Sequence, residues 1–289
     1  MSVESVAPDV IHVQVPERSP RRDLQAVKIV LHRELIRFWQ DKTRMIASLI
    51  QPVLFLLVLG TGLSSLMSSG TGGVDLRTFM FPGVLALSVI FTALFSAGSI
   101  VWDREFGFMR EMLVAPVSRT SIVFGKCLGG AAVATFQGVV ILALAGLADV
   151  PYSPTLLLTL LGELLLLSFT LAAFGVMMAA RITNMQSFMA VVQMAVMPMF
   201  FLSGALFPLS SLPAWLGFLT RVNPLTYAVD PMRQAVFAHL DVGAGAAATL
   251  NSGVTWFGWQ VPLPLELGLV AGIGVVLLGV AVAQFRRTD

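Results

Sequence analysis

The residues whose side chains could carry out chemistry are few and widely scattered. The three histidines lie far apart in the sequence, no H-E-x-x-H pair is present, and the single cysteine, Cys127, has no partner for a disulfide within the chain. The segment Gly125-Lys126-Cys127 lacks both the earlier glycine and the hydroxyl residue of a phosphate-binding G-x-x-x-x-G-K-[ST] loop. The sequence therefore predicts no catalytic residue, no metal site and no cofactor bound to this chain.

The charged segment from Trp102 to Met112 is a candidate docking surface. Acidic and basic residues alternate in it, and Phe106, Met109 and Met112 form an apolar stripe at helical spacing. A connection between antiparallel helices needs only a few residues, and this segment is longer than that. We therefore expect an additional short helix that forms a contact surface for another protein. An ordinary solvated loop is the alternative. The predicted docking residues are Asp103, Arg104, Glu105, Phe106, Gly107, Met109, Arg110, Glu111 and Met112.

A single acid, Glu163, lies within an apolar run, about 12 Å along a helix from Thr155. A charged carboxylate at that depth is costly, so Glu163 should be protonated or paired. Two interpretations stay open: a functional intramembrane acid, or a neutral carboxyl group that hydrogen-bonds a neighbouring helix and holds the bundle together.

Six long apolar runs must position these residues. Hydrophobic residues make up 56% of the 289 and charged residues 12%, and the mean hydropathy is +0.85, which is typical of a membrane protein. The runs are continuous and near bilayer length, whereas a barrel would show segments of about 10 alternating residues, so we expect an all-helical bundle. The six predicted transmembrane helices are Met45 to Met67, Met80 to Val101, Ile122 to Ala148, Thr155 to Ala180, Ser187 to Phe207 and Leu265 to Phe285.

The distribution of Lys and Arg predicts the orientation. Placing the N-terminus in the cytoplasm puts 15 of the 18 basic residues on the cytoplasmic side and leaves only Arg77, Arg221 and Arg233 outside. Both termini are therefore expected in the cytoplasm. The basic pI of about 9.0 then follows from membrane orientation and indicates no nucleic-acid partner.

The N-terminal region has two predicted parts. Residues 1–22 contain three prolines and no apolar stretch of signal-peptide type, so we expect a flexible cytoplasmic tail. Residues 23–44 show apolar positions at three- and four-residue spacing with basic residues between them, which predicts an amphipathic helix. This helix could lie on the inner membrane surface or contact a soluble partner, and we expect both roles, with contact residues Arg33, Arg37 and Phe38.

Residues 45–289 form the predicted six-span domain, with a cytoplasmic element at 102–121 and an outer segment at 208–264. In the outer segment, Leu209 to Val222 and Leu225 to Phe237 have helical spacing, and Asn223-Pro224 breaks the pattern between them. We expect short outer-face helices there, with a local ion pair between Asp230 and Arg233 at i,i+3 spacing.

Two separated motifs carry a family resemblance. The motif Asp103-Arg104-Glu105-x-Gly107, followed by Leu113, Pro116, Ser118-Arg119 and Gly125-Lys126, resembles the first cytoplasmic loop of type-2 ABC transporter permeases. The stretch Phe201-x-Ser203-Gly204-x-x-Phe207-Pro208-x-x-x-Leu212-Pro213, then Asn223-Pro224-Leu225-Thr226-Tyr227, Asp230 and Arg233, is similar to the signature of that family near its fifth span. The resemblance is to the bacterial daunorubicin/doxorubicin-resistance subfamily in particular.

This resemblance implies an exporter in the bacterial cell membrane that moves a hydrophobic or amphipathic drug or lipid, as in antibiotic efflux and lipid export. Two permease chains, expected to be a homodimer, would pair with two cytoplasmic ABC ATPase subunits that hold ATP and Mg. The helix after the second span would couple to the ATPase, and residues 208–264 would cap the exit. The implied outer gate comprises Asn223, Pro224, Tyr227, Asp230 and Arg233.

The resemblance also implies that the second and fifth spans line the substrate path. The fifth span is rich in Met and Phe, whose side chains repack around varied apolar ligands, and Pro198 predicts a kink in it. Lipid-facing or packing methionine is the alternative at each position. The predicted path residues are Phe91, Phe95, Gln193, Met194, Met197, Phe200 and Phe201.

Two other classes of protein are alternatives to an ABC permease. A proton-coupled secondary transporter using Glu163 would predict inverted repeats, and the first and second halves show no internal similarity. A membrane-embedded enzyme would need a cluster of His, Cys, Asp or Glu, and none is evident. A non-catalytic permease subunit is therefore the preferred prediction.

Overall fold

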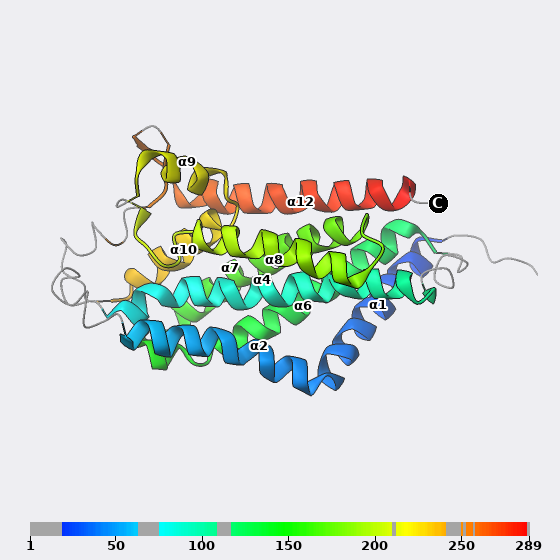
Figure 1. Ribbon diagram of the computed structural model, residues 1–289, viewed down its shortest axis with the longest axis horizontal. Coiled ribbons are helices and arrows are strands. Elements are labelled where there is room, and N and C mark those ends of the chain that lie inside the picture. The colour runs from blue at the N-terminus through cyan, green and yellow to red at the C-terminus, as the bar shows by residue number, and fades with distance from the viewer. Residues whose placement is uncertain are drawn as a thin grey trace, which may run out of the picture.

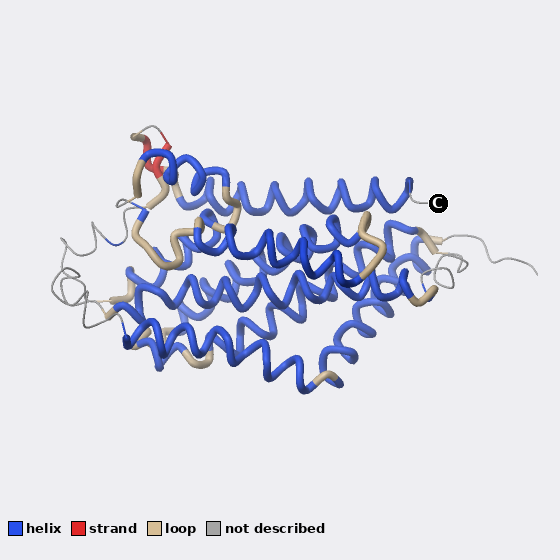
Figure 2. Tube along the Cα trace, in the orientation of Figure 1, coloured by secondary structure: helices blue, strands red, loops and turns tan. Residues whose placement is uncertain are grey.

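The computed structural model describes residues 19–62, 75–108, 117–209, 212–240, 250, 253–256 and 258–287. These residues are mostly helical, and long helices lie side by side along a common axis while α1 crosses one end obliquely (Figures 1 and 2). We call the end with α1 and the C-terminus the α1 end, and the opposite end the α10 end. The elements are α1 (Pro20–Gln40), α2 (Lys42–Leu54), η1 (Phe55–Leu59), α4 (Leu76–Glu105), α6 (Arg119–Leu142), η2 (Ala145–Ala148), α7 (Pro154–Ala179), α8 (Met185–Phe201), α9 (Ala214–Val222), α10 (Thr226–Phe237), β1 (Thr255–Trp256), β2 (Trp259–Gln260) and α12 (Leu263–Arg287).

Within the described ranges, five helices are long and apolar enough to cross a membrane, which is consistent with the predicted helical membrane protein. They are the run Lys42–Gly62, α4, α6, α7 and α12. The predicted fifth span is the 17-residue helix α8, about 26 Å long. It ends at Phe201 instead of Phe207, because the chain turns at Gly204, where φ is +76°. The count of six spans stays a prediction.

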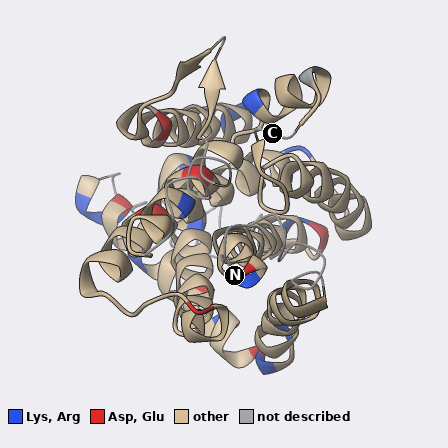
Figure 3. Cartoon of the chain, turned by 90° about the vertical axis from the view of Figure 1, so that its left-hand side faces the viewer, with Lys and Arg blue, Asp and Glu red and all other residues tan. Residues whose placement is uncertain are grey.

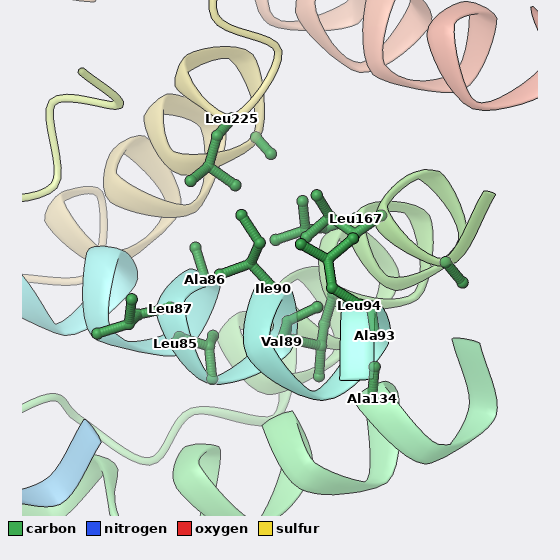
Figure 4. Close-up of a cluster of buried hydrophobic side chains, with 14 of the residues drawn as sticks. Leu85, Ala86, Leu87, Val89, Ile90, Ala93, Leu94, Ala134, Leu167 and Leu225 are labelled. Carbon is green, nitrogen blue, oxygen red and sulfur yellow. The ribbon is translucent and has the colours of Figure 1, made fainter. Parts of the chain in front are cut away.

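Helix α4 is the centre of the bundle. In the most apolar 18-residue stretch of α4, 89% of the residues are buried inside the protein. The corresponding fraction is 17% for Lys42–Gly62 and 22% for α12. Helix α4 is therefore surrounded by protein, while the other two helices lie at the periphery. Its side chains pack with those of α6, α7 and α10 in one continuous apolar core (Figure 4). Small residues allow this close packing: a Cβ on Gly175 of α7 would lie 2.9 Å from the Cβ of Ala97 on α4.

The amphipathic helix forms as predicted, but it begins earlier, at Pro20. The Ser19 hydroxyl accepts a hydrogen bond from the Arg22 N–H, and proline is favourable in the first helical turn. The chain turns at Asp41, whose carboxylate caps α2 by accepting a hydrogen bond of 3.0 Å from the Arg44 N–H. This corner lets α1 leave the direction of the bundle while α2 follows it (Figure 1).

The predicted cytoplasmic element is partly different from expectation. Residues 102–105 belong to α4 itself, which continues past Val101 and stops at the glycine turn of Gly107, where φ is +84°. The predicted residues Met109, Arg110, Glu111 and Met112 lie outside the described residues.

At the α10 end, the two predicted outer helices are present as α9 and α10, with Asn223-Pro224 between them. A two-stranded antiparallel hairpin of β1 and β2 follows before α12. Figure 3 looks onto this end of the bundle, and most of the chain in it is coloured as neither basic nor acidic. The Asn223 side chain ties the segment to α8, since Nδ2 donates to the Met199 carbonyl oxygen at 2.6 Å.

Gly129→Ala is expected to lower the thermal midpoint of the purified chain in detergent. The new Cβ on α6 would lie 2.8 Å from the Cβ of Glu34 on α1, and overpacking of this kind costs about 1–3 kcal/mol. The matched control is Gly162→Ala, whose Cβ meets no atom within 4 Å. Equal midpoints for the two variants would contradict the close packing of α1 on α6.

Candidate functional site

Three helices meet at a buried group of charges near the α1 end. The Lys126 Nζ atom of α6 lies 2.7 Å from Oε1 of Glu34 on α1 and 2.7 Å from Oδ2 of Asp103 on α4. It also donates a hydrogen bond of 2.8 Å to the Ser99 hydroxyl, and Arg33 contacts the same Asp103 oxygen at 2.6 Å. We refer to Arg33, Glu34, Ser99, Asp103 and Lys126 as the charge cluster.

The charge cluster is electrically balanced, and all its side chains except the partly exposed Arg33 are buried. The side chains of Lys126 and Glu34 are only 2% and 4% exposed. An unpaired ion at such a position costs several kcal/mol, whereas two cations and two carboxylates compensate one another at hydrogen-bond distance. The balance requires all three helices, so the cluster attaches α1 to α4 and α6.

The local sequence of α6 explains why α1 packs so closely against it. Gly125 and Gly129 face α1 from one side of α6, and a Cβ at Gly125 would lie 2.9 Å from the Cβ of Val30. Without side chains at these two positions the backbones approach closely. Lys126 lies between the two glycines and meets Glu34, which projects from the buried face of α1.

The next two residues of α4 fasten other helix ends. The Arg104 guanidinium donates hydrogen bonds to the carbonyl oxygens of Ala180 and Ile182 at 3.0 and 2.9 Å, where α7 ends. Glu105 Oε2 accepts a hydrogen bond of 3.1 Å from the Met185 N–H in the first turn of α8. Each contact satisfies a backbone group that the helix itself leaves unpaired, with the charge that suits the helix dipole. The end of α4 is thus joined to four neighbouring helices.

Three residues of the predicted docking surface have partners within this chain. Asp103 is buried and paired within the chain, and Arg104 and Glu105 are bound to α7 and α8, because polar groups at a crowded helix end find partners there. Two phenylalanine rings of the segment are strongly exposed, Phe106 at 67% and Phe108 at 56%, and Glu105 and Gly107 are exposed beside them. Contact of this surface with a partner stays a prediction.

The predicted contact residues of α1 also face the chain. Arg33 binds Asp103, and Phe38 meets the ring of Phe136 edge-on, with 6.0 Å between ring centroids. The Arg37 guanidinium lies 5.2 Å from the centre of the Trp102 ring. These three side chains therefore attach α1 to the bundle.

A groove of about 340 Å³ runs beside the charge cluster, between α1 and α2 on one side and α4 and α8 on the other. Four predicted path residues line it, and the rings of Phe91 and Phe95 stack at 5.9 Å. The other three do not line the groove: Phe200 is buried against Phe55, while Met194 and Phe201 are exposed. The four lining residues are Phe91, Phe95, Gln193 and Met197.

Sequence reasoning missed the wall of the groove that α2 supplies. Arg44, Ser48 and Gln51 all line the groove. Their i, i+4, i+7 spacing puts three polar residues on one face of a helix that is mostly apolar after its first turn. This polar stripe was the signal that could have identified them.

At the α10 end, the predicted ion pair between Asp230 and Arg233 is not formed as a direct contact. Arg233 is 2% exposed, donates a hydrogen bond of 2.5 Å to the Gly204 carbonyl oxygen, and lies 4.2 Å from the centre of the Phe79 ring. Asp230 instead accepts hydrogen bonds from Gln234 and from the Val254 N–H. Burial lowers the pKa of Arg233 to about 10, so it stays charged at neutral pH.

The remaining predicted gate residues belong to the same polar structure. The Tyr227 hydroxyl donates to the Arg221 carbonyl oxygen at 2.6 Å and accepts from Trp256 Nε1 at 2.9 Å. Asn223 and Pro224 form the break between α9 and α10. These contacts hold the outer segment together, and a gating role for it stays a prediction.

Glu163 lies inside the bundle on α7, and neither of its carboxyl oxygens has a hydrogen-bond partner among the residues that the structure describes. Glu266 of α12 is buried near both Glu163 and Asp230. No group of His, Cys, Asp or Glu side chains in the described ranges is arranged to hold a metal ion.

Comparison with known proteins gives consistent matches. The model of the ABC-2 type transporter family matches residues 25–237. A protein of Cyanophora paradoxa named as transport permease ycf38 is 28% identical over 221 residues, which cover 73% of each chain. An Escherichia coli K12 protein named as a multidrug ABC transporter permease is 28% identical over 58% of this chain and 47% of its own length. Nodulation protein J of Rhizobium leguminosarum bv. trifolii is 28% identical over 68% of this chain and 74% of its own.

Lys126→Met is expected to destabilise the chain by about 3–5 kcal/mol, since it removes the cation that lies 2.7 Å from both buried carboxylates and leaves only the partly exposed Arg33 to compensate them. Unfolding by urea in detergent measures the loss. Adding Glu34→Gln should recover part of it, with a coupling energy of about 0.5–3 kcal/mol. The control is Lys28→Met on the exposed face of α1, which should change stability by less than about 0.5 kcal/mol. Equal effects of Lys126→Met and Lys28→Met would contradict the charge cluster.

Proposed function

Because this chain belongs to the ABC-2 type transporter family, we propose that it is the permease subunit of an ATP-driven exporter. It forms the path through the membrane, while a separate cytoplasmic ABC ATPase binds ATP and Mg. Two permease chains and two ATPase subunits make the complete exporter. The α1 end faces the cytoplasm of a bacterial cell, in keeping with its concentration of Lys and Arg.

The charge cluster is the observation that carries this proposal. It joins α1 to α4 and α6, and Arg104 and Glu105 extend the attachment to the ends of α7 and α8. A displacement of the end of α4 is therefore transmitted to α1, α6, α7 and α8. A permease driven by an external ATPase needs a stiff connection of this kind between its surface and its spans.

The exposed rings of Phe106 and Phe108 at that tip are the proposed contact with the ATPase. Aromatic anchors that fill a partner's pocket supply much of the energy of an interface, and surrounding charges set its register. Phe106 is one of the predicted docking residues and Phe108 lies two positions beyond it; both rings are exposed, whereas Asp103 is already paired within the chain.

A second copy of this chain is proposed to cover the groove between α2 and α8. The window Lys42–Gly62 is strongly apolar but only 17% buried, and Met194 of α8 is 72% exposed. One chain leaves this face of the bundle open, so a symmetric pair would enclose a path that neither chain encloses alone. The apolar groove then suits a hydrophobic or amphipathic substrate, such as a drug or a lipid.

Phe106→Ala is expected to reduce ATPase stimulation and co-purification of an ABC ATPase encoded in the same gene cluster. Loss of a buried aromatic anchor costs about 2 kcal/mol or more, which corresponds to at least about tenfold weaker binding. Membrane levels of the permease should not change. Phe106 is a sharper test than Glu105, because Glu105→Ala would also remove the cap on α8.

The matched control is Phe218→Ala, since Phe218 is an equally exposed phenylalanine on α9 at the α10 end, with 63% of its surface accessible. This variant should bind the ATPase as the native chain does. Unchanged binding and ATPase activity in Phe106→Ala would contradict the proposed contact.

The second candidate function is a proton-coupled secondary transporter that uses Glu163. The observation in its favour is a buried carboxyl group without a hydrogen-bond partner among the described residues. An ATP-driven exporter has no need of a proton at this position, so Glu163→Gln, which keeps the shape and removes the titrating proton, should transport normally.

This second test measures efflux of a fluorescent amphiphile from vesicles that contain the permease and its ATPase. Full ATP-dependent efflux by Glu163→Gln across pH 6 to 8, within about twofold of the native rate, rules out an essential proton carrier. Loss of efflux while ATP hydrolysis continues would favour the proton-coupled alternative.

A further inference from the structure

A smaller hollow of about 110 Å³ adjoins the apolar groove at the α1 end. Phe38, Arg44 and Phe95 belong to the walls of both spaces. Unlike the groove, this hollow is lined by several charged side chains, among them Arg37 and Asp41. We call it the polar chamber. A polar chamber that shares walls with an apolar groove suits a ligand with one polar end and one apolar end.

Two guanidinium groups at the polar chamber have no ion pair or side-chain hydrogen bond with any residue in the described part of the chain. They rest on aromatic rings instead: Arg37 lies over Trp102 at 5.2 Å, and Arg44 lies over Phe95 at 5.8 Å. A ring face attracts the cation but leaves the N–H groups at its edge available. Both groups can therefore donate hydrogen bonds to a ligand.

The charges around the polar chamber do not balance. Glu34 lines it, but its carboxylate is paired with Lys126 inside the charge cluster. Asp41 is the other acidic residue in the lining, and its carboxylate already caps the first turn of α2. Against it stand Arg37 and Arg44, so the chamber carries one uncompensated positive charge. A ligand with one negative charge would neutralise it.

We propose that the polar chamber and the groove together bind an amphiphile with a single anionic group, a phosphate or a carboxylate. The anionic group accepts hydrogen bonds from Arg37 and Arg44, as guanidinium groups favour in planar, paired geometry. The apolar chain lies along the groove past Phe95 and Phe91. This inference rests on the proposed exporter function and specifies its substrate class.

The dimensions of the groove fit this placement. Arg44 and Gln51 of α2 both line it and are seven residues apart, which is about 10 Å along a helix. Phe95 and Phe91 are one helical turn apart on α4, with stacked rings. The volume of about 340 Å³ lies in the usual range of about 300–1,000 Å³ for small-molecule sites.

The main rival role for these arginines is anchoring at the membrane surface. Long basic side chains near helix ends often extend toward lipid headgroups without selecting a ligand. Anchoring would draw anionic lipid to the protein surface, but it would not place the apolar chain of that lipid beside Trp102 in a single saturable site. A fluorescence experiment separates the two roles.

The full-length permease is placed in phosphatidylcholine nanodiscs with Trp102 as its only tryptophan, the other four being replaced by Phe. Phosphatidylglycerol brominated on its acyl chains is the anionic probe, and phosphatidylcholine brominated in the same way is the zwitterionic control. In both lipids the bromine is carried near the carboxyl end of each acyl chain, next to the headgroup. Bromine quenches indole fluorescence only at short range, and Trp102 lines the polar chamber, so quenching reports a lipid whose headgroup lies in the chamber and whose apolar chain starts there.

Brominated phosphatidylglycerol should quench Trp102 saturably, with a midpoint at about tenfold lower mole fraction than brominated phosphatidylcholine. One charge-assisted contact is worth about 1.5–3 kcal/mol, which is tenfold or more in affinity. Arg44→Gln and Arg37→Gln should each remove the preference. Arg181→Gln, at an exposed arginine after α7, should retain it.

Two competitors distinguish the source of the anion. Decyl phosphate should displace the brominated lipid and restore fluorescence, whereas inorganic phosphate at the same concentration should not. Displacement by inorganic phosphate alone would overturn the proposal, because the apolar chain would then contribute nothing.

Equal quenching by the two brominated lipids, or an unchanged preference in Arg44→Gln and Arg37→Gln, would also overturn it. The experiment contains no ATPase. A negative result would therefore leave the proposed coupling to ATP untouched, and failure of ATPase binding would leave the ligand preference measurable.

Discussion

The arrangement of the α1 end depends on one interaction, the ammonium group of Lys126 held between the carboxylates of Glu34 and Asp103. A lysine inside an apolar helix bundle is tolerated only if anions reach it at close range. Those anions come from two other helices, so the need to neutralise Lys126 fixes where α1 lies. The amphipathic helix is thereby part of the bundle and not a separate surface element.

Other features of this end follow from the same constraint. The glycines on either side of Lys126 bring α1 close enough for Glu34 to reach it. Asp103 points into the bundle. The next two residues of α4, Arg104 and Glu105, therefore point to other sides of the helix and bind the ends of α7 and α8. The aromatic residues after them project from the tip of α4. Because Glu34 is already neutralised, Arg37 and Arg44 face only Asp41, and the polar chamber keeps one uncompensated positive charge.

The sequence predicts the helices well, since a long apolar run that must satisfy its own backbone in lipid has one solution. Two helices are present where the helical spacing after residue 208 predicts them, and four of the predicted path residues, Phe91, Phe95, Gln193 and Met197, line one groove, while their role in a substrate path stays a prediction. The charge cluster was not, because Glu34 and Lys126 are 92 residues apart and composition does not reveal which charges will meet. Asp103 illustrates the consequence: its charged neighbours suggested a surface residue, and only the three-dimensional packing shows an internal partner.

Hydrogen–deuterium exchange of the full chain in nanodiscs tests the central claim most directly. If Lys126 holds α1 in the bundle, amides in the middle of α1 should exchange as slowly as those of α6. In Lys126→Met they should exchange much faster, while α7 stays protected. A helix that merely rests on the membrane surface would show the same exchange in α1 with and without Lys126, and that result would contradict the account.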